Sequence, residues 1–169
     1  YVTTAITDDA LDFIDRHAAA PFYLSVHYTA PHSPWTGHPQ DIVDSYADCA
    51  FASCPQEQIH PWAVGHPLSE NCLGNREMLK GYFAAVTAMD RDIGRILDKL
   101  AECGLRENTL VVFASDNGFS CGHHGFWGKG NGTYPPNMFE NSIKVPFVIS
   151  HLGHIPEGAV QQEMVSAYD

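Results

Sequence analysis

Hydrophobic residues recur at three- and four-residue steps in two stretches of the chain, which is the spacing of an amphipathic helix. The first stretch covers residues 3–17, with its repeated positions at Ile6, Ala10, Phe13, Ile14 and His17. The second extends from Asn75 to Cys103, with its repeated positions at Met78, Leu79, Phe83, Val86, Met89, Ile93, Ile96, Leu97 and Leu100. Gly104 follows, and glycine commonly ends a helix. We therefore predict a helix in each stretch.

Three short runs rich in aromatic and β-branched residues predict strands. They cover residues 22–28, 109–114 and 145–150. The second run is apolar throughout, as in a strand that is buried on both faces. Because strands alternate with helices along the chain, we predict the α/β class, with a mostly parallel sheet flanked by helices.

Residues 35–73 lose this periodicity and are rich in proline, glycine and histidine. Loops of this length are uncommon in compact domains and are often functional, so we predict an irregular insertion that lines or covers a site. The chain opens with Tyr1 in a predicted helix and stops at Asp169 without a terminating element. We therefore expect one partial domain over residues 1–169, truncated at both ends, and leave its cellular location open.

The charge of the chain bears on its partners. A net charge of −11 would repel a nucleic-acid backbone or an anionic membrane surface. No apolar run approaches the roughly 20 residues that a membrane helix needs. We therefore expect neither nucleic acid nor membrane as a partner, and any bound anion must be met by local cations.

The cysteines are odd in number, so at least one is unpaired within the chain. They are Cys49, Cys54, Cys72, Cys103 and Cys121. The three between positions 49 and 72 permit a local disulfide in an oxidising compartment, and free thiols in a surface insertion are the alternative. None has the CxxC spacing of a zinc or redox motif, so the sequence assigns them no chemistry.

Asp116 and Asn117 follow the predicted strand at 109–114 and offer one charged and one neutral side-chain oxygen before Gly118. Hard cations such as Ca²⁺ and Mg²⁺ take oxygen ligands of this kind. Asp-Asn-Gly is also good turn chemistry anywhere, so the pair alone leaves both interpretations open. In open α/β sheets, ligands gather beyond the carboxyl ends of the strands, where His32 also lies.

The stretch from Gly122 to Gly130 combines four glycines with cationic or hydrogen-bonding side chains. Glycine lets the backbone approach a ligand closely, while His124 and Lys129 could meet an anion there. His32 stands between prolines, which restrict its backbone. An imidazole can donate a proton to a leaving oxygen near neutral pH, although a loop histidine without a task is the alternative.

Four segments, taken together in this order, resemble the sulfatases of the alkaline phosphatase superfamily. They are PFYLSVHYTAPHSP (21–34), YFAAVTAMDRDIG (82–94), SDNG (115–118) and HGFWGKG (124–130). Several motifs that agree in order are a more specific signal than any one of them. The resemblance implies part of the alkaline-phosphatase-like fold and makes the chain a partial sulfatase catalytic domain.

The resemblance also implies a role for each candidate residue. Asp116 and Asn117 are similar to the second pair of ligands of a single Ca²⁺ or Mg²⁺. Lys129 resembles the residue that contacts the sulfate and its bridging oxygen, and His32 the one that helps to protonate the leaving alcohol. His124 is expected at the wall of the substrate pocket. His32 and Lys129 are thus the expected catalytic residues, and both would touch the substrate.

The family nucleophile is a formylglycine made in a Cys/Ser-x-Pro-x-Arg motif, and this motif is absent from the sequence, as is an earlier aspartate doublet. We therefore expect both to lie in a missing segment, and the 169 residues alone to be inactive and prone to self-association. The sequence also departs from the common pattern in residues 139–146. Asn141 and Ser142 replace two glycines, and Lys144 replaces an arginine.

The expected function is hydrolysis of a small-molecule or carbohydrate sulfate ester. The first alternative is a phosphodiesterase or phosphonate monoester hydrolase of the same superfamily. The alternative from another class is a non-catalytic fragment that binds an anion or a metal.

Overall fold

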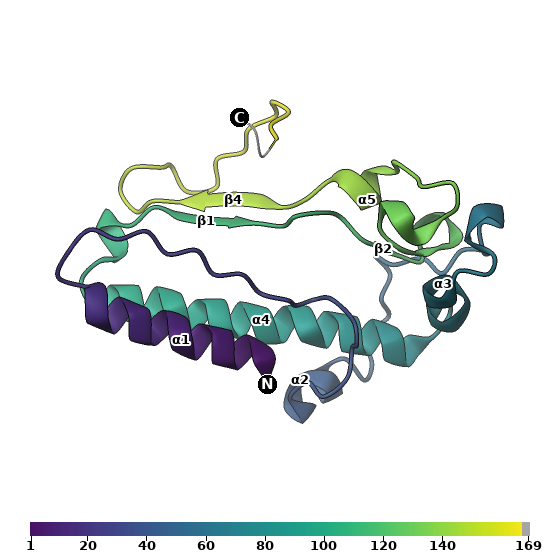
Figure 1. The fold of residues 1–169 in the computed structure, drawn as a ribbon, viewed down its shortest axis with the longest axis horizontal. Helices are drawn as coiled ribbons and strands as arrows, with labels where there is room; N and C mark the ends of the chain where they lie inside the picture. The colour runs from purple at the N-terminus through teal and green to yellow at the C-terminus, as the bar shows by residue number, and fades with distance from the viewer. Residues whose placement is uncertain (167–169) are drawn as a thin grey trace.

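The computed structural model describes residues 1–166 as a long body built on one helix, α4 (Arg76–Glu102), which follows its longest axis (Figure 1). Asn75 caps this helix, since its Oδ1 accepts hydrogen bonds from the backbone N–H groups of Glu77 and Met78 at 3.1 and 3.4 Å. Gly104, just beyond the end, has φ +68°, the left-handed conformation that commonly terminates a helix. The prediction of a long helix here is confirmed.

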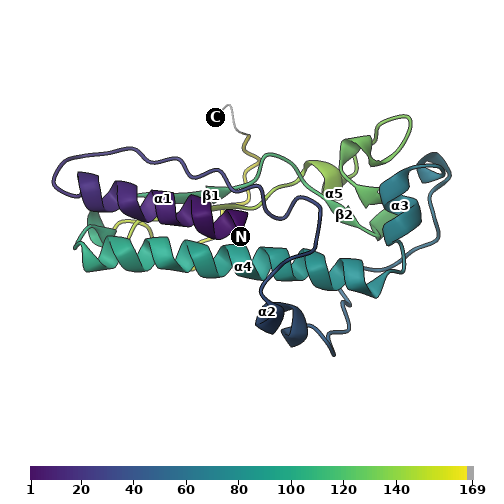
Figure 2. The same ribbon diagram turned by 60° about the horizontal axis from the view of Figure 1, so that its bottom comes forward.

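Helix α1 (Val2–His17) lies alongside α4 in both ribbon views (Figures 1 and 2). Its predicted apolar face is buried at Ala10 and Ile14, which are 4% and 0% exposed. Polar contacts cross the same boundary: Thr4 donates to Asp92 at 3.0 Å, and Arg95 bridges Asp92 and Asp8 at 2.9 and 2.6 Å. The buried Asp92 carboxylate thus has partners from both helices.

Two predicted strands are present as β1 (Val111–Ala114) and β4 (Phe147–Ser150). They pair in antiparallel register, with Val112 opposite Ile149. A second antiparallel pair joins β2 (Ser120–Cys121) to β3 (Trp127–Gly128). The α/β class is confirmed, but the expected parallel pairing is not seen among the described residues. Parallel neighbours need a long crossover, usually through a helix, whereas only one-turn helices lie between β1 and β4.

The strand predicted at 22–28 is not formed within the described residues. This segment is extended and its side chains alternate between half-buried and exposed, but no strand pairs with it. It is anchored to α1 by side chains instead. The Tyr28 hydroxyl lies 2.8 Å from Thr7 Oγ1, and the Phe22 and Phe13 rings are 5.7 Å apart. The aromatic and β-branched composition of this run therefore predicted the extended backbone correctly and the sheet pairing wrongly.

The stretch 35–73 contains three short helical segments: α2 (Gln40–Ser45), η1 (Pro61–Ala63) and α3 (Pro67–Cys72). It crosses the N-terminal half of α4, where Ile42 packs on Ala84 and Ala88. No helix in residues 1–166 is both long enough and apolar enough to cross a membrane.

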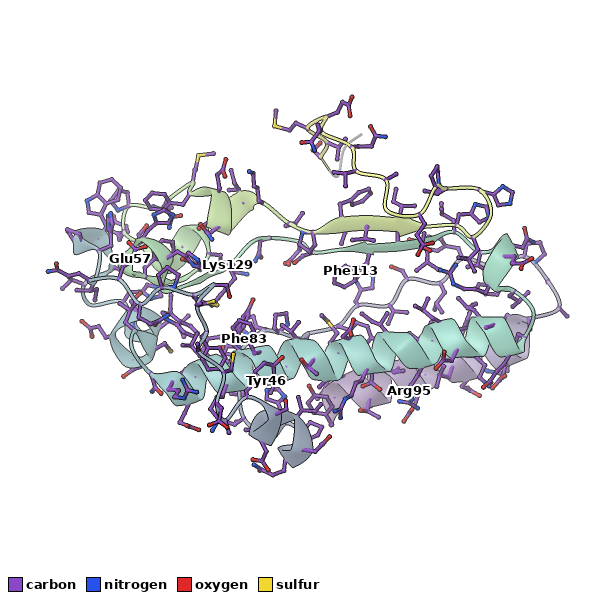
Figure 3. All side chains as sticks on the ribbon, turned by 180° about the vertical axis from the view of Figure 1, so that it is seen from behind. Tyr46, Glu57, Phe83, Arg95, Phe113 and Lys129 are labelled. Carbon is purple, nitrogen blue, oxygen red and sulfur yellow. The ribbon has the colours of Figure 1, made fainter. Side chains whose placement is uncertain are left out.

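The main core lies at the end of the molecule that carries α3, β2 and β3. Its buried members are Trp35, Phe51, Cys72, Leu79, Ala85, Cys121 and Trp127. The remaining short helices are η2 (Arg106–Asn108), η3 (His123–Gly125), η4 (Gly130–Gly132) and α5 (Glu140–Ile143). Figure 3 shows Lys129 and Glu57 at this end, away from Arg95 on the α1–α4 pair. The core therefore supports the segments that hold most of the candidate residues.

Candidate active site

The structure brings Lys129 and Asn117 together. Lys129 follows β3 and Asn117 follows β1, and the Lys129 ammonium donates a hydrogen bond to Asn117 Oδ1 at 2.8 Å. Both side chains are partly buried, so the cation is held beside the amide rather than free in solvent. A fixed, partly desolvated ammonium group is a stronger anion partner than a mobile surface lysine.

Asp116 lies next to this pair and is exposed. The Ser115 hydroxyl donates to the Asn117 carbonyl at 3.0 Å and lies 3.5 Å from the Asp116 carboxylate. The turn is fixed from the other side by Gly118, whose N–H donates to the Ser142 carbonyl at 3.1 Å. A Cβ at position 118 would collide with the Asn141 carbonyl oxygen and lie 2.8 Å from that of Lys144. Glycine is needed here for close approach, not for a left-handed turn.

His32 is positioned by Trp35. The Trp35 indole N–H donates to the Pro31 carbonyl at 2.7 Å, which closes the loop around His32. The Trp35 ring contacts Trp127 and Phe119 at centroid distances of 5.2 and 5.9 Å. Phe119 follows the Asp116 turn and Trp127 precedes Lys129, so the loop of His32 rests on both segments that carry the other candidates.

The His32 ring is exposed, and its Nδ1 lies 2.8 Å from the Ser33 carbonyl oxygen. A carbonyl can only accept, so Nδ1 carries the proton in this hydrogen bond. The tautomer is thereby set, and Nε2 is the nitrogen left to exchange a proton with a ligand.

His124 is exposed and has φ +58°, a left-handed conformation that is uncommon for a residue with a side chain. Its ring stacks on Phe139 at a centroid distance of 4.1 Å and an interplanar angle of 9°. The two rings line an open cavity of about 520 Å³, together with Glu57, Gln58, Ile59, His60 and Pro61. Residues 57–61 of the insertion therefore line a cavity together with His124, and that this cavity is the substrate pocket stays a prediction.

Asn137 connects this wall to Lys129, and no sequence pattern marks it as a site residue. It is 8% exposed, and its Nδ2 lies 3.3 Å from the Lys129 carbonyl oxygen, to which it donates. Its Oδ1 accepts from the Phe139 N–H at 3.3 Å and from the Ser142 hydroxyl at 2.7 Å. The Ser142 hydroxyl therefore has a buried hydrogen-bond partner. A serine can stand here, where the family resemblance expects a glycine, without leaving a polar group unpaired.

A divalent cation would find only part of its ligands here. Asp116 and Asn117 offer hard oxygen donors, as Ca²⁺ or Mg²⁺ requires. Within residues 1–166, no group of three or more His, Cys, Asp or Glu side chains could hold a metal ion. Since Ca²⁺ takes six to eight ligands and Mg²⁺ six, the pair fits a cation only if further ligands come from another segment.

Comparisons with known proteins identify the family of the chain. The sequence profile of the Sulfatase family matches residues 1–169. An arylsulfatase of Clostridium perfringens is 31% identical over 92% of this chain and 33% of its own length. An ulvan-active sulfatase of Formosa agariphila is 33% identical over 90% of this chain and 28% of its own length. The chain thus spans about a third of the length of these relatives.

Solved structures show the same fold. A sulfatase homologue from Bacteroides fragilis, yidJ, superposes with a TM-score of 0.69 at 25% identity, over 88% of this chain and 30% of its own. BT4656, solved with D-glucosamine-2-N,6-O-disulfate, gives 0.69 at 22% identity, over 89% of this chain and 43% of its own. The chain accordingly belongs to the sulfatase family, with its alkaline-phosphatase-like fold.

Proposed function

We propose that the full-length protein is a sulfuric ester hydrolase that splits a sulfate ester into an alcohol and sulfate. The observation that carries this proposal is the 2.8 Å contact between Lys129 Nζ and Asn117 Oδ1. It places a cation next to an acid–amide pair, in a chain whose whole length matches the sulfatase family. Sulfate is a tetrahedral anion, so the ammonium would offset part of its charge, and a divalent cation held by the acid–amide pair would offset more.

In this proposal, Lys129 binds a sulfate oxygen and the bridging oxygen, where negative charge grows as the ester bond breaks. His32, protonated on both ring nitrogens, gives its Nε2 proton to the departing alcohol oxygen, while the Nδ1 hydrogen bond to Ser33 holds the ring. Asp116 and Asn117 would hold Ca²⁺ or Mg²⁺, which would supply polarisation of the sulfate oxygens when bound. The nucleophile, a formylglycine, comes from a segment outside these 169 residues.

We infer a carbohydrate sulfate as the substrate class. The relatives include proteins named ulvan-active sulfatase, iduronate 2-sulfatase and endo-4-O-sulfatase. The substrate of BT4656 is a disulfated glucosamine. In this chain, the cavity beside the site is lined by the flat rings of His60, His124 and Phe139. Such rings can pack on the apolar faces of a sugar while the polar groups around them fix its orientation.

A phosphodiesterase or phosphonate monoester hydrolase is the second candidate. A multifunctional alkaline phosphatase superfamily protein, PehA of Trinickia caryophylli, is 26% identical over 92% of this chain and 35% of its own length. Purified full-length protein should be assayed with 4-nitrophenyl sulfate, 4-nitrophenyl phosphate and bis(4-nitrophenyl) phosphate. We expect kcat/KM to be at least roughly tenfold higher for the sulfate, a difference of about 1.4 kcal/mol in transition-state binding. A preference for either phosphate ester would overturn the proposal.

A further inference from the structure

Two distant segments lie in direct backbone contact at the edge of the core. The Glu57 N–H donates to the Gly122 carbonyl at 3.4 Å, and the His60 N–H to the Gly125 carbonyl at 2.8 Å. Gly122 has φ +105°, and a Cβ there would collide with Gln56 Nε2 and lie 2.6 Å from the Pro55 carbonyl oxygen. The residues that directly follow Cys54 and Cys121 therefore touch each other.

Gln56 fixes the two cysteine backbones to each other. Its Nε2 donates to the carbonyl oxygens of Cys54 and Cys121 at 2.9 and 2.8 Å. Its Oε1 accepts from the Gly74 N–H at 3.0 Å and from the Trp127 indole at 3.3 Å. The bonds to Cys121 and Trp127 hold the insertion against the segment 121–127, and the bond to the Cys54 carbonyl ties Cys54 to the same amide, so the two cysteines are held as neighbours.

The two thiols also interact with each other. A hydrogen bond from the Cys121 thiol lowers the pKa of Cys54 to about 6, and the same bond together with burial raises the pKa of Cys121. Cys54 is partly exposed, while Cys121 is 4% exposed in the core. Cys54 is therefore the reachable, nucleophilic member of the pair, because the thiolate is the reactive form of cysteine.

We propose that Cys54 and Cys121 form a thiol–disulfide exchange site that closes an intrachain disulfide between the insertion and β2. The oxidant is a small-molecule disulfide such as oxidised glutathione. The Cys54 thiolate attacks one of its sulfurs, which forms a mixed disulfide and releases one glutathione thiolate. The Cys121 thiol then passes its proton to the released glutathione thiolate, and its sulfur attacks the Cys54 sulfur, which releases the second glutathione as a thiolate. Two protein thiols lose two electrons, and one glutathione disulfide gains them.

Cys72 is the competing partner, because it belongs to the same core cluster as Cys121. It is 2% exposed, and burial raises the pKa of its thiol. An external disulfide thus reaches it less easily, and less of it is thiolate. Within residues 1–166, the nearby thiols do not belong to a group of three or more side chains that could hold a metal ion. Exchange with Cys54 is the chemistry that the geometry favours.

The proposed disulfide would form close to the candidate active site. Cys121 starts the segment that leads through Trp127 to Lys129, and Cys54 lies three residues before Glu57, the first of the residues 57–61 that line the cavity. A bond between them would lock the cavity wall onto the chain that carries Lys129. This disulfide is a different one from the local bond within residues 49–72 that the sequence permits.

The test uses purified full-length protein treated with oxidised glutathione, then blocked with N-ethylmaleimide and digested without reduction. Trypsin cuts after Arg76 and Arg106, and a glutamyl endopeptidase cuts after Glu57 and Glu70, so Cys72 is separated from Cys54. Mass spectrometry should detect the peptide that ends at Glu57 linked to the peptide that contains Cys121.

The linked peptide should be lost in Cys54→Ser and kept in Cys49→Ser, the matched control from the same peptide. Cys103→Ser, on the far end of α4, should keep it too. Two results would overturn the proposal: a wild-type protein in which Cys54 and Cys121 are both blocked by N-ethylmaleimide without a link, or a link from Cys121 to Cys72 instead. The wild-type measurement decides even if a variant fails to fold, because fragmentation of the linked peptide shows whether Cys49 or Cys54 carries N-ethylmaleimide.

Discussion

Two glycines of α4 provide a matched test of how the loop of His32 is seated. Gly81 faces Trp35: a Cβ at position 81 would collide with the Trp35 carbonyl oxygen and lie 2.8 Å from the Trp35 Cβ. Gly94 lies further along the same helix, and a Cβ there would meet nothing within 4 Å. The same substitution, glycine to alanine, should therefore have opposite effects at the two positions.

The magnitude follows from two terms. Alanine in place of glycine in a helix interior stabilises by about 0.8–1 kcal/mol, and this gain applies to both positions. Overpacking at Gly81 costs about 1–3 kcal/mol, because Trp35 is 6% exposed and packed on Trp127 and cannot move freely. We expect Gly94→Ala to raise the free energy of unfolding by up to about 1 kcal/mol. The free energy of unfolding of Gly81→Ala should be about 1–3 kcal/mol lower than that of Gly94→Ala.

Urea unfolding of the full-length variants, followed by tryptophan fluorescence, measures this difference. The variants should share the denaturant slope m and differ in midpoint. A displaced Trp35 would also move the loop of His32, so Gly81→Ala should lose sulfate ester hydrolysis while Gly94→Ala keeps it. Equal stability and equal activity of the two variants would refute the close contact between α4 and Trp35.

Three further predictions concern the support of the site and the isolated chain. Asn137→Ala should lower the free energy of unfolding by about 1–3 kcal/mol, because its buried partners lose their hydrogen bonds. Asn131→Ala, at an exposed position, should change it by less than about 0.5 kcal/mol. Equal free energies of unfolding for the two variants in urea titration would contradict this prediction. The 169-residue chain alone should hydrolyse no sulfate ester, because it lacks the Cys/Ser-x-Pro-x-Arg motif of the proposed nucleophile; turnover that persists in its Lys129→Met variant would point to contamination, and turnover abolished by it would refute the prediction. The same chain should self-associate, because Val112, Phe147 and other apolar side chains of β1 and β4 are exposed; light scattering that finds only monomers would contradict this.

A second apolar surface, between β1 and α4, adds to the self-association prediction. Phe113 projects from β1 toward α4 (Figure 3) and lines a cavity of about 380 Å³. Met89, Ile93 and Leu97 of α4 line its other side. These helix residues belong to the apolar repeat that predicted the helix, and Val86, in the same repeat, is 36% exposed. Their periodicity marked an apolar face correctly, and this chain covers only part of it.

Elements governed by local rules could be predicted from the sequence. The long helix has its periodicity, its Asn75 cap and its Gly104 stop within one stretch of chain, so each signal supports the others. Strand pairing depends instead on the path of the chain between the strands. Residues 115–146 return β4 to β1 without a crossover helix, and no local pattern in 109–114 or 145–150 encodes that path.

The residues of the candidate site also fall into two groups, those that a local sequence pattern marks and those that it does not. Asp116, Asn117 and Lys129 could be found because charged or amide side chains beside glycines after a strand are a recognisable combination. Asn137 and Gln56 could not, because each acts through hydrogen bonds to distant backbone groups, and neither has a periodic or compositional signature. The pairing of Cys54 with Cys121 was equally hidden, since the sequence suggested only neighbours between 49 and 72.

The most direct test of the central claim compares His32→Ala and Lys129→Met in the full-length protein on two sulfate esters. One ester, 4-nitrophenyl sulfate, releases an alcohol that departs readily as an anion, and the other, a sugar sulfate, releases one that needs a proton. We predict that Lys129→Met lowers kcat/KM by roughly 10²–10³ on both esters, as expected for lost charge stabilisation. His32→Ala should lower it far more on the sugar sulfate. Folded variants that keep wild-type kcat/KM on both esters would contradict the account.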